Sequence, residues 1–155
     1  MAETVSIEPV PPEERVELLL EQVWLFQGYA LSLAHASGLS PEEAAGRFFA
    51  GIASGRPGRT ASAEEIGRIA SSVAGFLQML WGNGRVRRDG ETWLVETRLD
   101  GKAKEVLDRW HVPVAYFGRW TAEVQRREGD LIQIEWRTRL EGDIMQQELH
   151  PRPSQ

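Results

Sequence analysis

The sequence predicts an α+β fold, in which N-terminal helices pack on an antiparallel sheet and the chain closes as helix, strand, turn and strand. Apolar residues recur at helical spacing as far as Trp81. Two strand–turn–strand patterns follow, each built around a glycine-containing turn. Because helices and strands segregate instead of alternating, an antiparallel sheet covered by helices is favoured. We expect one domain over residues 1–155, with residues 1–11 as a loose lead-in.

The first helix is expected from Pro12 to Ala36, and Gly38 ends it. Gln27 lies within its apolar stripe, where the amide must find a hydrogen-bond partner or face a cavity. The stripe is wide and consists of Val16, Leu19, Leu20, Val23, Trp24, Ala30, Leu31 and Ala34.

Capping boxes predict where the next two helices begin. Residues 40–43 open a helix that continues through Ile52, and residues 62–65 open one whose buried face extends to Trp81. The loop at residues 54–59 between them is rich in glycine and arginine. It lacks the phosphate-binding P-loop pattern and follows no strand, so we do not assign it a phosphate site.

A hairpin and a short helix come next. Residues 85–88 and 91–99 read as strands around an Asp-Gly turn. The arginines at its start are interpreted as charge on a solvated hairpin. A helix is then expected over residues 101–110, with Asp100 as its cap.

The C-terminal segment begins with Pro113, expected at the first position of a helix that ends at residues 128–130. From Leu131 to Leu140 polar and apolar residues alternate, which is typical of a half-buried strand. A Gly-Asp turn at residues 141–143 returns the chain into a second strand over residues 144–149. The apolar face of the first strand consists of Ile132, Ile134, Trp136, Thr138 and Leu140.

Composition argues against several function classes. The net charge of −5 is unlike that of a general nucleic-acid binder, and no apolar run approaches the length of a membrane span. There is no cysteine, hence no disulfide or thiolate zinc site, which fits a cytoplasmic protein. The three histidines, His35, His111 and His150, form no local metal motif. We therefore expect neither a metal ion nor a cofactor.

Six tryptophans are the most suggestive feature of the chain. Large aromatic side chains commonly fill a core, and this accounts for most of them. A cavity between the apolar sheet face and the first and last helices would need similar residues together with a few polar groups. The sequence leaves both interpretations open. The ligand-binding residues we would expect in such a cavity are Gln27, Tyr29, Tyr116, Trp120 and Trp136.

The helical first half followed by helix, strand, Gly-Asp turn and strand resembles the 4-vinyl reductase superfamily and the neighbouring aminothiazoline-carboxylate-hydrolase-like group. The resemblance implies a compact α+β domain that binds a small, largely apolar molecule, sometimes as a sensor, and is often dimeric. That family usually places cysteines around its last two strands, and this chain has none, so no catalytic residue is carried over. The residues that carry the resemblance are 18–34, 116–123, Gly129-Asp130, 132–139, 141–143, Met145 and Leu149.

Three functional hypotheses follow. The first is a cytoplasmic, non-enzymatic domain, homodimeric, that binds a small apolar molecule as a sensor or regulatory module. The second is a cofactor-free hydrolase or isomerase in which His111 acts as general base beside a carboxylate, which requires an inward-facing imidazole. The third is a structural or adaptor protein whose exposed apolar patch meets a partner or a second copy.

Overall fold

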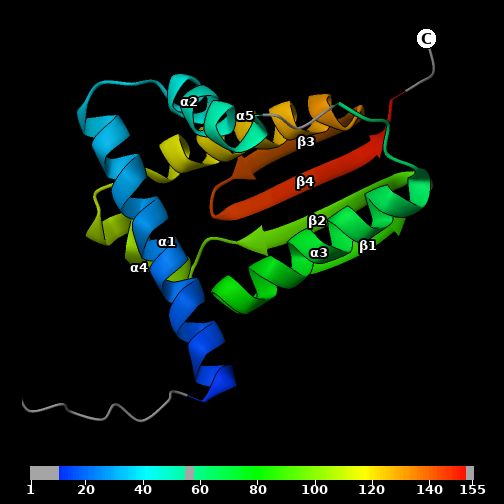
Figure 1. Ribbon diagram of the computed structural model, residues 1–155. Helices are drawn as coiled ribbons and strands as arrows, with labels where there is room; N and C mark the ends of the chain where they lie inside the picture. Colours follow the sequence, from blue (N-terminus) through cyan, green and yellow to red (C-terminus); the bar gives the residue numbers. More distant parts are fainter. Residues whose placement is uncertain (1–10, 55–57, 153–155) are drawn as a thin grey trace, which may run out of the picture.

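The computed structural model describes residues 11–54 and 58–152 and confirms the α+β architecture (Figure 1). The expected lead-in lies, except for Pro11, outside the described residues, as does part of the glycine-rich loop. No described helix has both the length and the hydropathy needed to cross a membrane. The elements are α1 (Pro12–Ala36), α2 (Pro41–Ala53), α3 (Ala63–Trp81), β1 (Arg85–Asp89), β2 (Thr92–Arg98), α4 (Gly101–Arg109), α5 (Val114–Leu131), β3 (Ile134–Glu141) and β4 (Ile144–Pro151).

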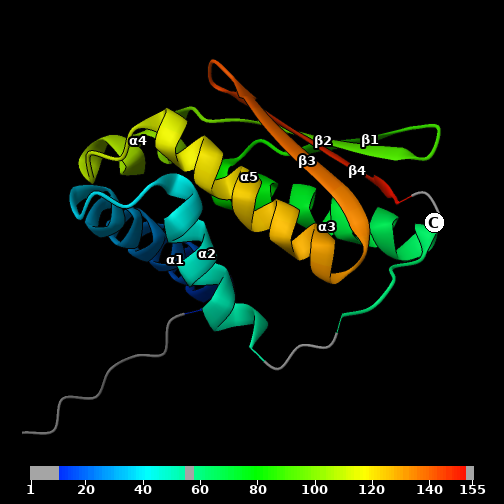
Figure 2. The same ribbon diagram turned by 90° about the horizontal axis from the view of Figure 1, so that it is seen from above.

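The two hairpins join into one antiparallel sheet with the strand order β1-β2-β4-β3. Pairing of β2 with β4 places Val95 opposite Gln147 and Trp93 opposite Leu149. Figure 2 shows α3 and α5 lying under one face of this sheet, with no described helix on the other. Polar residues such as Glu96 and Gln146 alternate onto the open face.

An aromatic cluster fills the core where α1, α3 and α5 meet. Trp24 packs edge-on against Trp81 and Phe117, with ring centroids 5.2 and 5.3 Å apart. Trp120 stacks on Phe117 from the next turn of α5, with centroids 6.4 Å apart. The prediction that tryptophans fill a core is thus confirmed for this cluster.

Both capping boxes form as predicted. The Glu43 backbone N–H donates to Ser40 Oγ, and the Ser40 N–H donates to the Glu43 carboxylate. Ser62 and Glu65 make the same reciprocal pair at the start of α3. These local hydrogen bonds need no tertiary partner, which is why the sequence alone locates both helix starts.

Two predicted boundaries of α5 are wrong. Pro113 is the residue before the helix, because its ψ of 135° is extended, and the first helical residue is Val114. Residues 128–130 do not end α5, which continues to Leu131. A Cβ on Gly129 would lie 3.1 Å from the Ile134 carbonyl oxygen, so this glycine lets β3 approach the helix closely instead of terminating it.

Asp100 occupies the N-cap position of α4, as predicted, but its side chain does not cap the helix. Asp100 makes no side-chain cap hydrogen bond, and its carboxylate instead accepts one from Asn83 Nδ2 at 3.1 Å. Asn83 also accepts hydrogen bonds through Oδ1 from the Thr97 hydroxyl and the Arg98 N–H. The loop after α3 is thereby fastened to the end of β2.

Candidate functional site

An open apolar groove of about 350 Å³ lies between α3 and α5, over the inner face of β3 and β4. Apolar residues at helical spacing on α3 form one wall, and the inward face of α5 forms the other. Gln27 of α1 closes one side. The residues that line this groove are Gln27, Ser72, Val73, Phe76, Leu77, Leu80, Trp81, Phe117, Trp120, Thr121, Val124, Gln125, Glu128, Trp136, Met145 and Gln147.

A hydrogen-bonded amide network forms the floor of this groove. Gln147 on β4 is only 1% exposed, and its Oε1 accepts hydrogen bonds from Gln125 Nε2 at 2.9 Å and from Trp136 Nε1 at 3.3 Å. The Thr138 hydroxyl donates to Gln125 Oε1. A buried polar network with these contacts holds its side chains in one arrangement, so the floor of the groove is rigid.

Two buried polar atoms at the groove have no hydrogen-bond partner in the described part of the chain. They are Trp81 Nε1 and Thr121 Oγ1, and both residues line the groove. Trp81 is only 8% exposed. Leaving such a group unpaired costs about 1–3 kcal/mol, so each atom would gain from a hydrogen-bond acceptor or donor brought next to it.

A second apolar groove, of about 500 Å³, lies between α1 and α2. Gln27 and Trp120 line both grooves, so the two hollows adjoin one another at these side chains. Arg47 is the ionisable residue among the lining of the second groove, which otherwise consists mainly of aliphatic and aromatic groups.

Of the predicted ligand-binding residues, the structure brings Gln27, Trp120 and Trp136 together in the first groove. Tyr29 lies outside it. The Tyr29 ring is 45% exposed and packs on Trp110, with centroids 5.1 Å apart.

Tyr116 also lies outside the lining of both grooves and has a connecting role. Its hydroxyl donates a hydrogen bond to the Leu39 carbonyl oxygen at 3.1 Å, and His35 packs edge-on against its ring. Burial raises the pKa of the Tyr116 phenol, and the carboxylates of Glu42 and Glu43 reinforce that shift. The side chain therefore ties α5 to the turn between α1 and α2.

His111 faces solvent at the junction of α4 and α5. Its φ of 53° follows from the tight turn there, and its backbone N–H donates to the Asp108 carbonyl oxygen at 3.1 Å. The exposed imidazole makes no ion pair with any described residue. The inward orientation that a general base requires is therefore not present.

The remaining ionisable groups in the described ranges are not arranged around a metal ion. His150 lies 3.3 Å from Glu135 on the open face of the sheet. Among the described residues, no group of three or more histidine, aspartate and glutamate side chains is placed to hold a metal ion.

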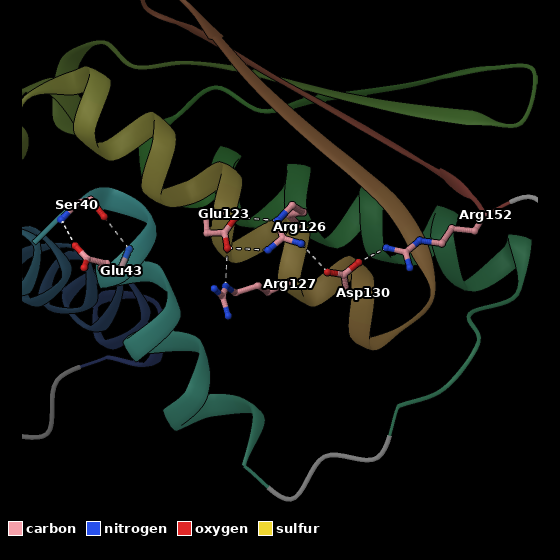
Figure 3. A network of polar contacts seen from close by, with 7 residues as sticks. All are labelled: Ser40, Glu43, Glu123, Arg126, Arg127, Asp130 and Arg152. Atoms are coloured by element: carbon pink, nitrogen blue, oxygen red, sulfur yellow. Dashed lines mark hydrogen bonds and ion pairs between the residues drawn. The ribbon is translucent and has the colours of Figure 1, made fainter.

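A ladder of ion pairs runs along the outer side of α5 (Figure 3). Glu123 accepts hydrogen bonds from Arg126 Nε and Arg127 Nε at 2.8 and 2.7 Å. Arg126 also pairs with Asp130 at 2.8 Å, and Asp130 pairs with Arg152 beyond β4. Arg126, followed by Arg127, lowers the pKa of the Glu123 carboxyl. Because both carboxylates of the ladder, Glu123 and Asp130, are paired with arginines, we interpret it as a structural feature of α5 and not as a catalytic group.

Sequence reasoning missed the contribution of α3 and the amide floor. The periodicity of α3 identified a buried face but could not indicate that part of it borders an open groove. Gln147 offered a usable signal, because a polar residue occupies an inward position between Met145 and Leu149 in a strand that alternates. No protein-family model, curated protein or solved structure matches the chain. The resemblance to the 4-vinyl reductase superfamily stays a prediction, and the groove is the basis for a functional proposal.

Proposed function

We propose that this protein is a cytoplasmic, non-enzymatic binding domain for a small, largely apolar molecule that carries a hydrogen-bond acceptor. The first groove is its binding site. The observation that carries the proposal is the presence of two buried polar atoms without partners, Trp81 Nε1 and Thr121 Oγ1, among apolar lining residues. An indole N–H can only donate, which is why the ligand should offer an acceptor such as a carbonyl.

The rest of the groove supports the same class of ligand. Val73, Phe76 and Val124 offer apolar surface, whose burial contributes about 25 cal/mol per Å². The rigid amide floor limits the cost of ordering the site when a ligand binds. Gln27 at the side of the groove supplies an amide that can orient a polar end of the molecule.

Binding is favoured over catalysis by the shortage of ionisable groups. Among the described lining residues of the first groove, Glu128 alone is ionisable, and none is a histidine. General acid–base catalysis by a pair of side chains needs two such groups within reach of the substrate. His111, the residue on which the enzyme hypothesis depends, lines neither groove.

A thermal-denaturation screen tests the proposal. We expect small apolar molecules with one carbonyl or carboxylate to raise the melting temperature, because a ligand that binds only the native state stabilises it by mass action. Matched hydrocarbons without the acceptor should raise it less. At a ligand concentration 100 times Kd the stabilisation is about 2.7 kcal/mol.

Val73→Phe then locates the binding site. Val73 is half-buried on the wall of the groove, so the larger phenylalanine side chain should fill the hollow and abolish the ligand-induced rise in melting temperature. Val86→Phe on β1, outside the groove, is the matched control and should retain it. An absence of any shift across the screen, or a shift that Val73→Phe leaves intact, would refute the proposal.

A second candidate function, association through an apolar surface, is favoured by a different observation. Several large apolar residues are exposed on α1 and α2, including Phe26 and Phe48. The homodimer expected from the sequence is therefore also a proposal.

A further inference from the structure

The second groove exists because small residues line it where α1 and α2 meet. Ala30 and Ala34 lie one helical turn apart on α1, and Ala44 of α2 lines the same hollow. None of these side chains extends beyond Cβ, so the space between the two helices is left unfilled. Leu39, in the turn that joins the helices, lies at one end. From Val23 to Ala34 the hollow follows α1 for about 16 Å.

Two side chains in this otherwise apolar lining are polar. Gln27 lies at the boundary with the first groove, and the exposed side chain of Arg47 lies at the rim. Aromatic rings widen the apolar surface, since Phe48 packs on Trp120 with ring centroids 5.2 Å apart. Ligand sites commonly have this composition, in which apolar walls bury most of the molecule and one or two polar groups orient it.

Arg47 is a cation without a bound anion in the part of the chain that the structure describes. The carboxylates nearest to it in the sequence are engaged elsewhere. Glu42 pairs with Arg119 at 2.9 Å, and Glu43 accepts a hydrogen bond from the Ser40 backbone N–H. Glu43 lies within electrostatic range of Arg47 but forms no ion pair with it. The Arg47 guanidinium can therefore pair with an anion that a ligand brings to the groove.

We propose that the second groove binds a small amphiphile, whose alkyl chain lies between α1 and α2 and whose anionic head group pairs with Arg47. A guanidinium donates two parallel N–H groups to the oxygens of a carboxylate or a similar anion. One arginine matches a head group of one charge. This site goes beyond the proposed function, because it is separate from the first groove and selects its ligand by charge.

The charges around Arg47 favour a dissolved amphiphile over an anionic membrane surface. Membrane surfaces of that kind attract clusters of lysine and arginine. Among the described lining residues of the second groove, Arg47 is the single cation. The first turn of α2 carries Glu42 and Glu43, which a layer of anionic head groups would repel. A single amphiphile can place its one head group at Arg47 alone.

Isothermal titration calorimetry with decanesulfonate, below the concentration at which micelles form, tests the charge selection. Arg47→Gln should weaken binding by about 10-fold, because a charge-assisted hydrogen-bonded pair is lost. Arg87→Gln is the matched control and should leave the affinity unchanged, since Arg87 is exposed on β1 and lines neither groove. Decyltrimethylammonium has the same chain and a cationic head, and it should bind about 10-fold more weakly than decanesulfonate or worse.

Ala30→Phe locates the alkyl chain of the ligand. Ala30 is exposed on α1, so the larger side chain does not disturb the core but should fill the hollow and abolish decanesulfonate binding. Ala50→Phe is the matched control, because Ala50 is exposed on α2 outside both grooves, and this variant should bind as the wild type does. Circular dichroism verifies that each variant is folded.

Four results would overturn this site. The first is a wild-type chain that does not bind decanesulfonate. The second is equal affinity for decanesulfonate and decyltrimethylammonium. The third is binding that neither Arg47→Gln nor Ala30→Phe weakens. The fourth is binding to phosphatidylglycerol vesicles that is stronger than binding to the dissolved amphiphile, which would indicate a membrane surface.

Val73→Phe separates this site from the first groove. It obstructs the first groove only, so decanesulfonate binding should persist in this variant. Loss of binding in Val73→Phe but not in Ala30→Phe would place the amphiphile in the first groove and refute the second site. Neutral carbonyl compounds lack the charge that Arg47 pairs with, so they decide the first proposal, and the two proposals can fail separately.

Discussion

Replacing Thr121 with valine should stabilise the unliganded protein. Thr121 Oγ1 is buried in α5 without a hydrogen-bond partner among the described residues. Valine has nearly the same shape and the same branching at Cβ, so Thr121→Val removes the hydroxyl while preserving the packing around it. The substitution therefore isolates the free energy of holding one unpaired hydroxyl away from water.

The magnitude follows from that burial. An unpaired buried hydroxyl costs about 1–3 kcal/mol in proteins, and some of this is recovered if the side chain relaxes towards solvent. We expect the free energy of unfolding to rise by about 1 kcal/mol. For a chain of this size that corresponds to an increase in melting temperature of about 2–4 °C.

Thr138→Val is the matched control, because the same substitution there has the opposite effect. The Thr138 hydroxyl donates to Gln125 Oε1 in the floor of the groove, and losing this bond should lower the free energy of unfolding by about 1 kcal/mol. Urea denaturation measures both changes, provided that the dependence on denaturant is unaltered. A Thr121→Val variant as unstable as Thr138→Val would show that the Thr121 hydroxyl is hydrogen-bonded in solution, and the reasoning would fail.

Two further predictions concern stability. A Cβ on Gly67 would lie 2.7 Å from the half-buried ring of Trp93, so Gly67→Ala should destabilise the protein by about 1–3 kcal/mol. Gly75→Ala on the same helix meets open space and should stabilise the protein by about 1 kcal/mol, and urea denaturation compares the two variants. Glu123 has a lowered pKa, so its ion pairs stabilise the fold above the unfolded value near pH 4 and that contribution is lost as pH falls through the folded pKa. The stability difference between wild type and Glu123→Gln should therefore be largest near pH 7 and should shrink as the pH falls below about 4, as measured by thermal unfolding across pH. A pH-independent difference would contradict this prediction.

Local hydrogen bonds and periodicity account for the parts of the fold that the sequence predicts. Ser40 and Ser62 locate two helix starts, because a capping box forms within four consecutive residues. The alternation around Trp136 correctly identifies the inward face of β3 from Ile134 onward, although the strand was predicted to begin at Leu131, which is the last residue of α5. The predicted end of α5 at Gly129 failed because the reason for this glycine is not local. A glycine is required at position 129 because β3 passes close to the helix there. Such a tertiary contact leaves no local signal in the sequence.

The candidate site was only partly predictable, because a groove depends on how elements meet. Gln27 could be found, since an amide within an apolar stripe needs an explanation. Trp120 and Trp136 followed from the inward faces of their elements. Tyr29 does not line the groove with Gln27, because residues two apart on a helix point in different directions. Its ring packs instead on Trp110, at the end of α4.

Helix α1 shows how far periodicity can be taken. Its sequence predicted one wide apolar stripe, but the structure divides those residues between two faces, with Trp24 and Leu31 in the core and Leu19 and Val23 exposed. Hydrophobicity alone cannot decide which face a monomer buries when both are apolar. The decision comes from shape. Gly28 lies on the same side as Trp24 and lets α1 approach α4 within contact of Trp110, whereas the exposed face that carries Leu19 and Val23 has no glycine. The need for close approach to α4 therefore selects the glycine face for burial, and the other apolar face of α1 stays exposed.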